Sequence, residues 1–167
     1  MKASLSFLVA LGFYFSASAQ TVEWETVHPY PGLSALRSVV AGEGRFVAAG
    51  ERGLYYSEDG GATWQEGTNE PSMAYSAVIY ANGRFVAVGD GGQVAVSLDG
   101  TTWSGHGVDS DAGFLAITFA NGLHVATGNN GLIATSSDGT TWTVQPPVVQ
   151  KKLRLLVYGN GQFLATD

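Results

Sequence analysis

The chain has 167 residues, with eight Lys and Arg against 14 Asp and Glu, and it contains no cysteine. A formal net charge of −6 repels phosphate backbones and anionic lipid surfaces, so nucleic acid and membrane surfaces are poor candidate partners. Without cysteine the fold has no disulfide and no thiolate zinc site, so packing alone must hold it together.

The first segment has the layout of a secretory signal. Lys2 precedes an apolar run from Leu5 to Phe15, and Ala17-Ser18-Ala19 forms a small-residue cleavage site. This run is too short to span a bilayer, which takes about 20 residues. We therefore predict a signal peptide at 1–19, no membrane insertion after its cleavage, and an exported mature chain, periplasmic, secreted or on the cell surface.

A repeat of 39 residues governs residues 20–167. Trp64, Trp103 and Trp142 follow one another at that step. A constant step of this length indicates an array of equal supersecondary units. Trp24 precedes Trp64 by 40 residues, so residues 22–28 are predicted to form an N-terminal strand equivalent to the last strand of a unit.

Each unit contains four short strand-like runs separated by Gly-containing turns. In the middle unit the turns are Asn82-Gly83, Asp90-Gly91-Gly92 and Asp99-Gly100. Asn-Gly and Asp-Gly between such runs indicate hairpins, because tight turns need positive φ. Four strands in about 40 residues is the size of one β-propeller blade. Small residues in the second run and the bulky Trp in the last fit blades that are crowded inside and splayed outside.

The sequence therefore predicts an all-β fold of four-stranded antiparallel β-propeller blades. The blades fall at about 35–67, 74–106 and 113–145, with a partial blade at 153–167. Because closed propellers have about four to eight blades, three and a half repeats predict an incomplete propeller, such as a fragment of a longer protein. Its unpaired blade edges would favour self-association.

One motif closes each unit. Its copies read Ser57-Glu-Asp59-Gly-Gly61-Ala-Thr63-Trp64, Ser97-Leu-Asp99-Gly100-Thr-Thr102-Trp103 and Ser136-Ser-Asp138-Gly139-Thr-Thr141-Trp142. The motif resembles the Asp-box, or BNR repeat, although the second and third copies are one residue shorter before the Gly. Asp-box repeats are found in sialidases, some endoglucanases, sortilin-type receptors and the photosystem II assembly factor group. The resemblance covers nearly all of the chain after Trp24 and implies a β-propeller.

The motif residues are predicted to be structural. An Asp side chain accepts hydrogen bonds from backbone N–H groups just after it, Gly takes a conformation closed to other residues, and Trp buries a large face. In the families that the chain resembles, the motif lies away from the active site. Three copies at equivalent places also cannot converge on one centre, so no catalytic residue is predicted.

Candidate binding residues lie in two sets of loops. Turns after the second strand and connections between blades emerge on one face, where binding residues gather on rigid scaffolds. The alternative interpretation is that acidic loops keep an exported protein soluble. The loop-face candidates are Arg52, Asp90 and Asn129 in the turns, with Glu70, Tyr75, Asp109, Asp111 and Phe114 in the connections.

Other chemistry finds little support. A sialidase needs an arginine cluster, whereas Arg45 and Arg84 recur at one repeat position, which indicates a solvated hairpin. Asp109 and Asp111 lack the oxygen-rich pattern of a calcium loop. His124 stands where other units have Phe, which indicates a packing residue. No metal and no cofactor are predicted.

The predicted function is that of a non-catalytic, secreted binding or scaffold module whose partner is a protein or a glycan. One alternative is a fragment of a propeller glycoside hydrolase, endoglucanase-like or sialidase-like, which would need two carboxylates facing each other across a cleft. Another is an assembly factor for a membrane complex, which rests on the resemblance alone.

Overall fold

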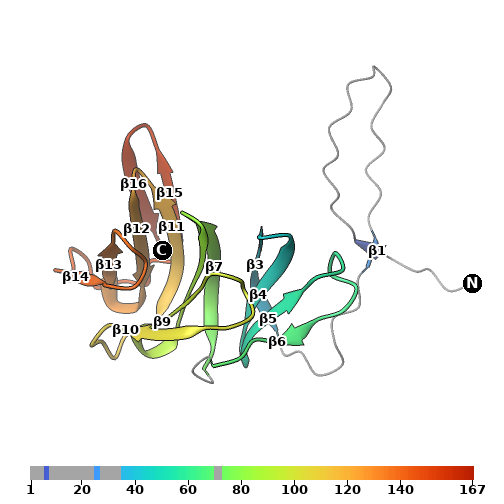
Figure 1. Cartoon of the computed structure of the whole chain (residues 1–167). Helices are drawn as coiled ribbons and strands as arrows, with labels where there is room; N and C mark the ends of the chain where they lie inside the picture. The colour runs from blue at the N-terminus through green and yellow to red at the C-terminus, as the bar shows by residue number, and fades with distance from the viewer. Residues whose placement is uncertain (1–5, 8–24, 27–34, 70–72) are drawn as a thin grey trace, which may run out of the picture.

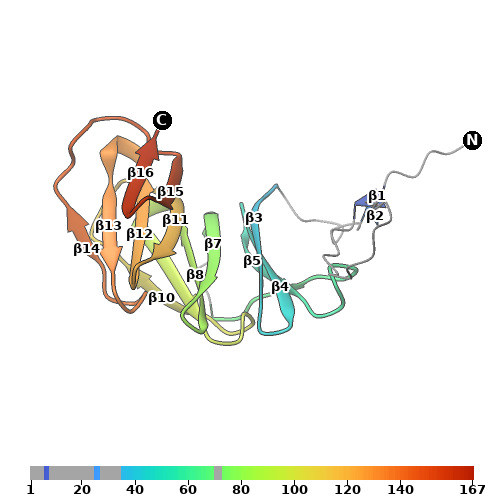
Figure 2. The same cartoon turned by 90° about the horizontal axis from the view of Figure 1, so that it is seen from above.

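A computed structural model describes residues 6–7, 25–26, 35–69 and 73–167 of the chain (Figure 1). Within these residues the protein is all-β, with three four-stranded antiparallel sheets and a two-stranded antiparallel sheet after them. The sheets follow one another in chain order along an arc (Figure 2). The predicted fold class, blades of a β-propeller with four antiparallel strands each, is confirmed.

Strand order within each sheet is the order along the chain. The first sheet consists of β3 (Leu36–Gly42), β4 (Arg45–Gly50), β5 (Gly53–Ser57) and β6 (Gln65–Glu66). The second consists of β7 (Tyr75–Ala81), β8 (Arg84–Gly89), β9 (Gln93–Ser97) and β10 (Ser104–Gly107), with the 3-10 turn η1 (Asp90–Gly92). The third consists of β11 (Phe114–Ala120), β12 (Leu123–Gly128), β13 (Ile133–Ser136) and β14 (Thr143–Gln145), with η2 (Asn129–Gly131). The last consists of β15 (Leu155–Gly159) and β16 (Gln162–Thr166).

The N-terminal region contributes two short strands. β1 (Ser6–Phe7) pairs in parallel with β2 (Glu25–Thr26). The rest of the predicted signal peptide, Trp24 and most of the predicted strand 22–28 lie outside the described residues. No helix in the described part of the chain is long and apolar enough to cross a membrane.

The first and second strands of each blade are joined by a tight two-residue turn. At Asn82-Gly83 both residues have positive φ, 52° and 74°, which matches the right-handed twist of the two strands. Asn121-Gly122 and Asn160-Gly161 repeat this geometry. The Asn-Gly dipeptides therefore set the register in which β7 pairs with β8, and β11 with β12.

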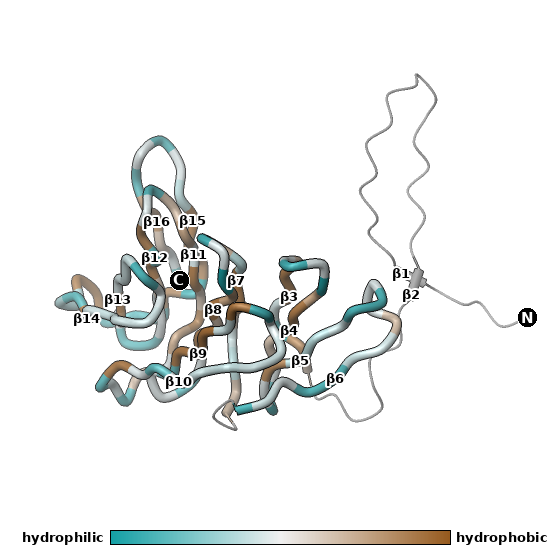
Figure 3. The backbone as a smooth tube through the Cα atoms, in the orientation of Figure 1, coloured by the Kyte–Doolittle hydropathy of each residue, from teal (hydrophilic) through white to brown (hydrophobic). Residues whose placement is uncertain are grey.

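Neighbouring sheets pack face to face, and the first strands β3, β7, β11 and β15 contact one another along the inner side of the arc. We call the side of a blade that meets the following blade its forward face, and the opposite side its rear face. Hydropathy is highest along the strands that form these faces (Figure 3). Between the second and third blades the buried core joins forward-face Val86, Val88, Val94 and Val96 to rear-face Phe114, Ile117, Ala126 and Ala134.

Large rings enter the core at the start of the innermost strands. Tyr75 and Phe114 are fully buried and lie opposite Gly89 and Gly128 on the second strands. A Cβ at Gly89 would stand 2.1 Å from the carbonyl oxygen of Ala74, so the close approach of the two strands requires glycine. The predicted gradient of side-chain size therefore holds for the second strand but not for the innermost one.

Candidate functional site

The three turns at 57–64, 97–103 and 136–142, here called the Ser-x-Asp turns, are closed by their own side chains. In the second turn, Ser97 Oγ accepts the Gly100 N–H at 2.8 Å. Asp99 Oδ1 accepts the N–H groups of Thr101 at 2.8 Å and Thr102 at 2.9 Å. The carboxylate therefore satisfies backbone donors that the tight turn would otherwise leave unpaired.

The other two turns use the same contacts. Asp138 Oδ1 accepts the N–H groups of Thr140 and Thr141 at 2.8 and 2.7 Å. In the first turn, which is one residue longer, Asp59 bonds to both the N–H and the hydroxyl of Thr63, at 2.9 and 2.6 Å. Each carboxylate is thus directed into its own turn.

These contacts hold the three carboxyl groups in the ionised form. Hydrogen bonds from the Thr63 hydroxyl and N–H lower the pKa of Asp59 to about 2. At Asp99 burial raises the pKa, but the N–H groups of Thr102 and Thr101 overcome it and the net shift is downward. The pKa of Asp138 is lowered by the N–H groups of Thr141 and Thr140. Groups with such low pKa values are poor general acids near neutral pH.

Two arginines connect the second and third Ser-x-Asp turns, one each, to the blade that precedes the turn. Arg84 Nη1 donates to the carbonyl oxygen of Asp138 at 2.8 Å, and Arg45 Nη1 donates to the carbonyl oxygen of Asp99. Both bonds span 54 residues of sequence, so one contact is repeated between successive blades. We call it the arginine latch.

The latch corrects the interpretation of Arg45 and Arg84 as a solvated hairpin. The Arg45 side chain is only 20% exposed and also pairs with Glu58 at 3.0 Å. The recurrence of arginine at one repeat position was the available signal, but its partner is a backbone carbonyl that no residue pattern encodes. In the third blade the equivalent position is Leu123, which cannot donate such a bond.

The turns of the predicted loop face are held rigidly by their backbones. Asp90 N–H donates to the carbonyl of Ala74 at 3.0 Å, and Asn129 N–H donates to that of Gly113 at 2.9 Å. The side chains of Asp90, Arg52, Asp109 and Asp111 are exposed, and that of Asn129 is half-buried. Glu70 lies outside the described residues.

Two loop-face predictions are wrong. The sequence predicts Tyr75 and Phe114 on the binding surface because they belong to the connections between blades, but both side chains have no exposed area. Each is the first residue of an innermost strand and belongs to the core between two blades. Neither can contact a partner at the surface.

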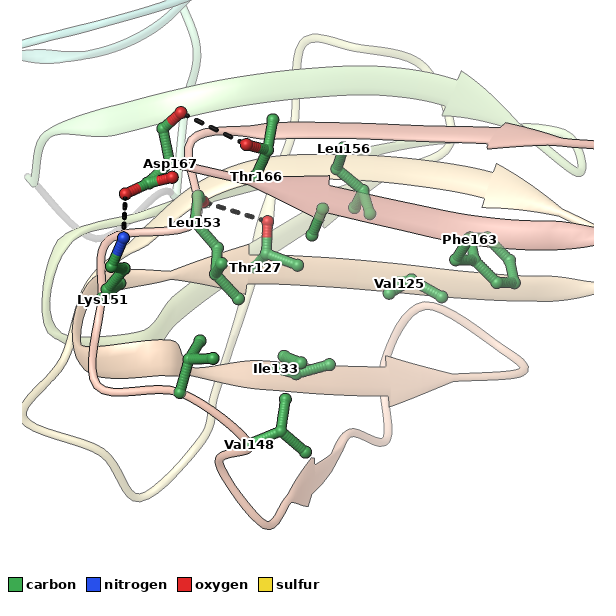
Figure 4. Close-up of a pocket in the computed structure, with 12 residues that line it drawn as sticks. Val125, Thr127, Ile133, Val148, Lys151, Leu153, Leu156, Phe163, Thr166 and Asp167 are labelled. Atoms are coloured by element: carbon green, nitrogen blue, oxygen red, sulfur yellow. Dashed lines mark hydrogen bonds and ion pairs between the residues drawn. The ribbon is translucent and has the colours of Figure 1, made fainter.

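A groove of about 470 Å³ lies between the third blade and the sheet β15–β16 (Figure 4). Val125 and Ile133 from the forward face of the third blade form one wall, and Leu156, Phe163 and Ala165 form the other. The connection from β14 to β15 closes one end of the groove. None of the predicted loop-face residues lines it, because the groove depends on contacts between sheets rather than on a local motif.

Polar contacts border the closed end of this groove. Thr127 Oγ1 donates to the carbonyl of Leu153 at 3.1 Å, and Lys151 Nζ lies 2.8 Å from Asp167 Oδ2 (Figure 4). Both members of the ion pair are more than half exposed, so the pair adds little stability. It places one charge of each sign at the closed end of a mainly apolar groove.

The edge of β16 runs along the groove. Among the described residues β16 pairs only with β15, whereas the equivalent strand β12 pairs with β11 and β13. Thr166 O accepts the Arg154 N–H at 2.9 Å and so faces β15. Since successive residues of a strand point their backbone groups to opposite sides, Phe163 and Ala165 direct theirs to the open edge.

No group of three or more His, Asp or Glu side chains in the described ranges is arranged to hold a metal ion. Asp109 and Asp111 are both exposed on the connection between the second and third blades, where Ser110 Oγ accepts the Ala112 N–H at 3.1 Å.

The arc of radiating sheets places the protein in the class of β-propellers. No protein-family model matches the chain, and no curated protein matches it. Solved structures do match. The chain is similar to the computationally designed Ika8 protein, with a TM-score of 0.65 and 15% identity over 85% of this chain and 46% of that one.

Two further solved structures are also similar to the chain. YCF48 bound to D1 peptide matches with a TM-score of 0.65 and 18% identity, over 86% of this chain and 50% of that one. An ancestral GH74 enzyme matches with a TM-score of 0.60 and 16% identity, over 77% of this chain and 21% of that one. The chain spans about half the length of Ika8 and YCF48. At such low identity the similarity concerns the fold alone.

Proposed function

We propose that the chain is a non-catalytic, exported binding module built on an Asp-box β-propeller. Its partner is an extended segment of another polypeptide, which pairs with the edge of β16 and covers the apolar groove. The observation that carries this proposal is the coincidence of an open strand edge with a groove of about 470 Å³. Backbone pairing gives affinity in this mode of recognition, and the groove selects the side chains.

The complete blades indicate which kind of strand would fit the open edge of β16. In the third blade β13 pairs with β12, with Ala134 opposite Ala126. Ala165 lies at the same repeat position as Ala126, so a bound strand would put a small side chain opposite Ala165. The apolar walls formed by Val125 and Phe163 favour apolar side chains from the partner rather than a polyhydroxylated glycan.

The similarity to YCF48 bound to D1 peptide supports a peptide partner, because that protein has the same fold and is captured with a peptide. The enzyme alternative is supported by the similarity to an ancestral GH74 enzyme. This similarity likewise concerns the fold alone. Export, and the absence of catalysis, remain predictions from the sequence.

A proline substitution tests the pairing. Ala165→Pro removes the N–H that faces the open edge without touching the bonds to β15, and proline is tolerated at such edges. Ala165→Ser keeps that N–H and serves as the matched control. The probe is a fluorescent peptide of residues 132–145, which in the third blade forms β13 and β14. Fluorescence anisotropy should show binding to the wild type and the Ser variant, and at least about tenfold weaker binding to the Pro variant.

Three results would count against the proposal. These are equal binding of the peptide by the Pro variant and the wild type, equal binding of a scrambled peptide and the probe, and no binding by a chain whose circular dichroism shows native β structure. Hydrolysis of a polysaccharide that is lost in Asp90→Asn, Asp109→Asn or Asp111→Asn would instead support the glycosidase alternative.

A further inference from the structure

The forward face of the last sheet is apolar and exposed. Leu155, Val157 and Leu164 point to this side and are 62%, 57% and 66% exposed. At the same repeat position as Leu164, Val86 and Val125 are buried against the following blade. This face is therefore apolar like the faces that pack between blades. It lies on the side of the sheet opposite the groove.

The rear face of the first blade shows the matching feature. Val39 is 61% exposed, whereas Val78 and Ile117, at the same repeat position, are buried against the preceding blade. Leu36 is likewise partly exposed where Tyr75 is fully buried. The two ends of the arc thus present the two halves of an interface that the molecule makes internally.

The two ends also match in extent. On the rear face of the first blade, Tyr55 and Trp64 of the outer half are already buried, together with Ala48. Tyr55 replaces the alanine found at this position in the next two blades, Ala95 and Ala134. Only the inner half, formed by β3, needs cover. The sheet β15–β16 has two strands and supplies an inner half alone.

We propose that two copies of the chain join head to tail, with the forward face of β15–β16 on one copy packed against the rear face of the first blade on the other. Two identical head-to-tail contacts close a ring with twofold symmetry.

The mass of the purified chain in solution, measured by light scattering across a concentration series, tests this ring. We expect the wild type at twice the mass of one chain. Leu164→Glu and Val39→Glu each place a charge in both contacts, and each should shift the protein to the mass of one chain. Leu98→Glu is the matched control, because Leu98 is 68% exposed on a Ser-x-Asp turn. It should leave the dimer intact.

A mixture of the two interface variants separates this arrangement from a symmetric face-to-face dimer. The Leu164→Glu chain keeps an intact rear face, and the Val39→Glu chain keeps an intact forward face. Mixing them should restore one good contact and return part of the protein to the dimer mass. In a dimer built from the same face on both copies, no such rescue occurs.

Four outcomes would overturn the ring. These are a monomeric wild type at every concentration, open polymers of increasing mass, loss of the dimer in Leu98→Glu, and failure of the mixture to restore it. Because Ala165 lies on the groove side of the sheet, Ala165→Pro should weaken peptide binding at least about tenfold without changing the mass. Failure of the binding proposal is therefore distinguishable from failure of the ring.

Discussion

His124 shows most clearly how one residue departs from its repeat. It occupies the position of Phe85, has no exposed area, and packs against Phe119 and Trp142 with ring centroids 4.5 and 6.2 Å apart. Within the described chain neither ring nitrogen has a hydrogen-bond partner. The sequence predicted its packing role from the repeat alone, since an aromatic ring of either kind fills the same space.

Burial lowers the pKa of His124 and the nearby Arg84 adds to this effect, while backbone at Ser136 and the charge of Asp138 act in the opposite direction. The unfolded chain therefore binds a proton more readily, and the histidine reduces stability as pH falls below about 6.5.

We expect His124→Phe to raise the free energy of unfolding at neutral pH by about 1 to 3 kcal/mol, because it removes unpaired buried polar atoms. It should also flatten the dependence of stability on pH between about 7 and 5. Urea denaturation at several pH values measures both effects, with His106→Gln as the control for a histidine that is only half-buried. An unchanged pH dependence in His124→Phe would show that the histidine is not buried in its neutral form.

At the scale of elements, the segment 67–69 covers Trp103 and so determines how much of this side chain is exposed. It runs beside the second Ser-x-Asp turn, where Thr68 N–H donates to Thr101 O at 2.8 Å and Trp103 N–H donates to Thr68 O at 2.9 Å. A Cβ at Gly67 would lie 2.8 Å from Trp103 Nε1, so glycine lets the indole pass beneath this segment. Trp103 is accordingly buried, whereas Trp142 is only half-buried.

Trp103→Ala should therefore lower the free energy of unfolding by about 3 to 5 kcal/mol, as expected for a large core side chain. Trp142→Ala should have a clearly smaller effect, because less of its surface is removed from water. Thermal and denaturant unfolding of the two variants under identical conditions gives the comparison. Equal losses would contradict the role of residues 67–69.

At the scale of the whole molecule, stability depends on how the blades are joined. Repeat proteins gain much of their stability from contacts between neighbouring units, and the arginine latch is such a contact. The Ser-x-Asp turns contribute to it from the other side, because Gly139 brings its turn close to the preceding blade. A Cβ there would lie 3.1 Å from Val86 Cγ2.

We expect Arg84→Met to lower the free energy of unfolding by about 1.5 to 3 kcal/mol, the range for a hydrogen bond from a charged group. Methionine keeps the apolar stem and removes the donor. Native-state hydrogen exchange should then show faster exchange in β11 to β14 than in β3 to β6. Uniform acceleration in all sheets would argue that the latch acts on the whole arc and not on one joint.

Much of the architecture could be predicted from the sequence because the repeat is strict. The 39-residue step, the Asn-Gly turns and the Trp of each unit locate the strands without any tertiary knowledge. The arginine latch could not be predicted, since its acceptor is a carbonyl 54 residues away. The groove and the burial of Tyr75 depend on how sheets meet, which local patterns do not encode.

The replacement of arginine by Leu123 in the third blade has a mechanical consequence. The blades of the arc are joined one after another, so the contact between blades that is weakest separates first when the arc is strained. Two joints carry an arginine whose hydrogen bond must break before the blades can separate, whereas Leu123 has no donor for such a bond. When the arc flexes, the sheet β15–β16 should thus swing as a hinged flap while the first three blades move as one body.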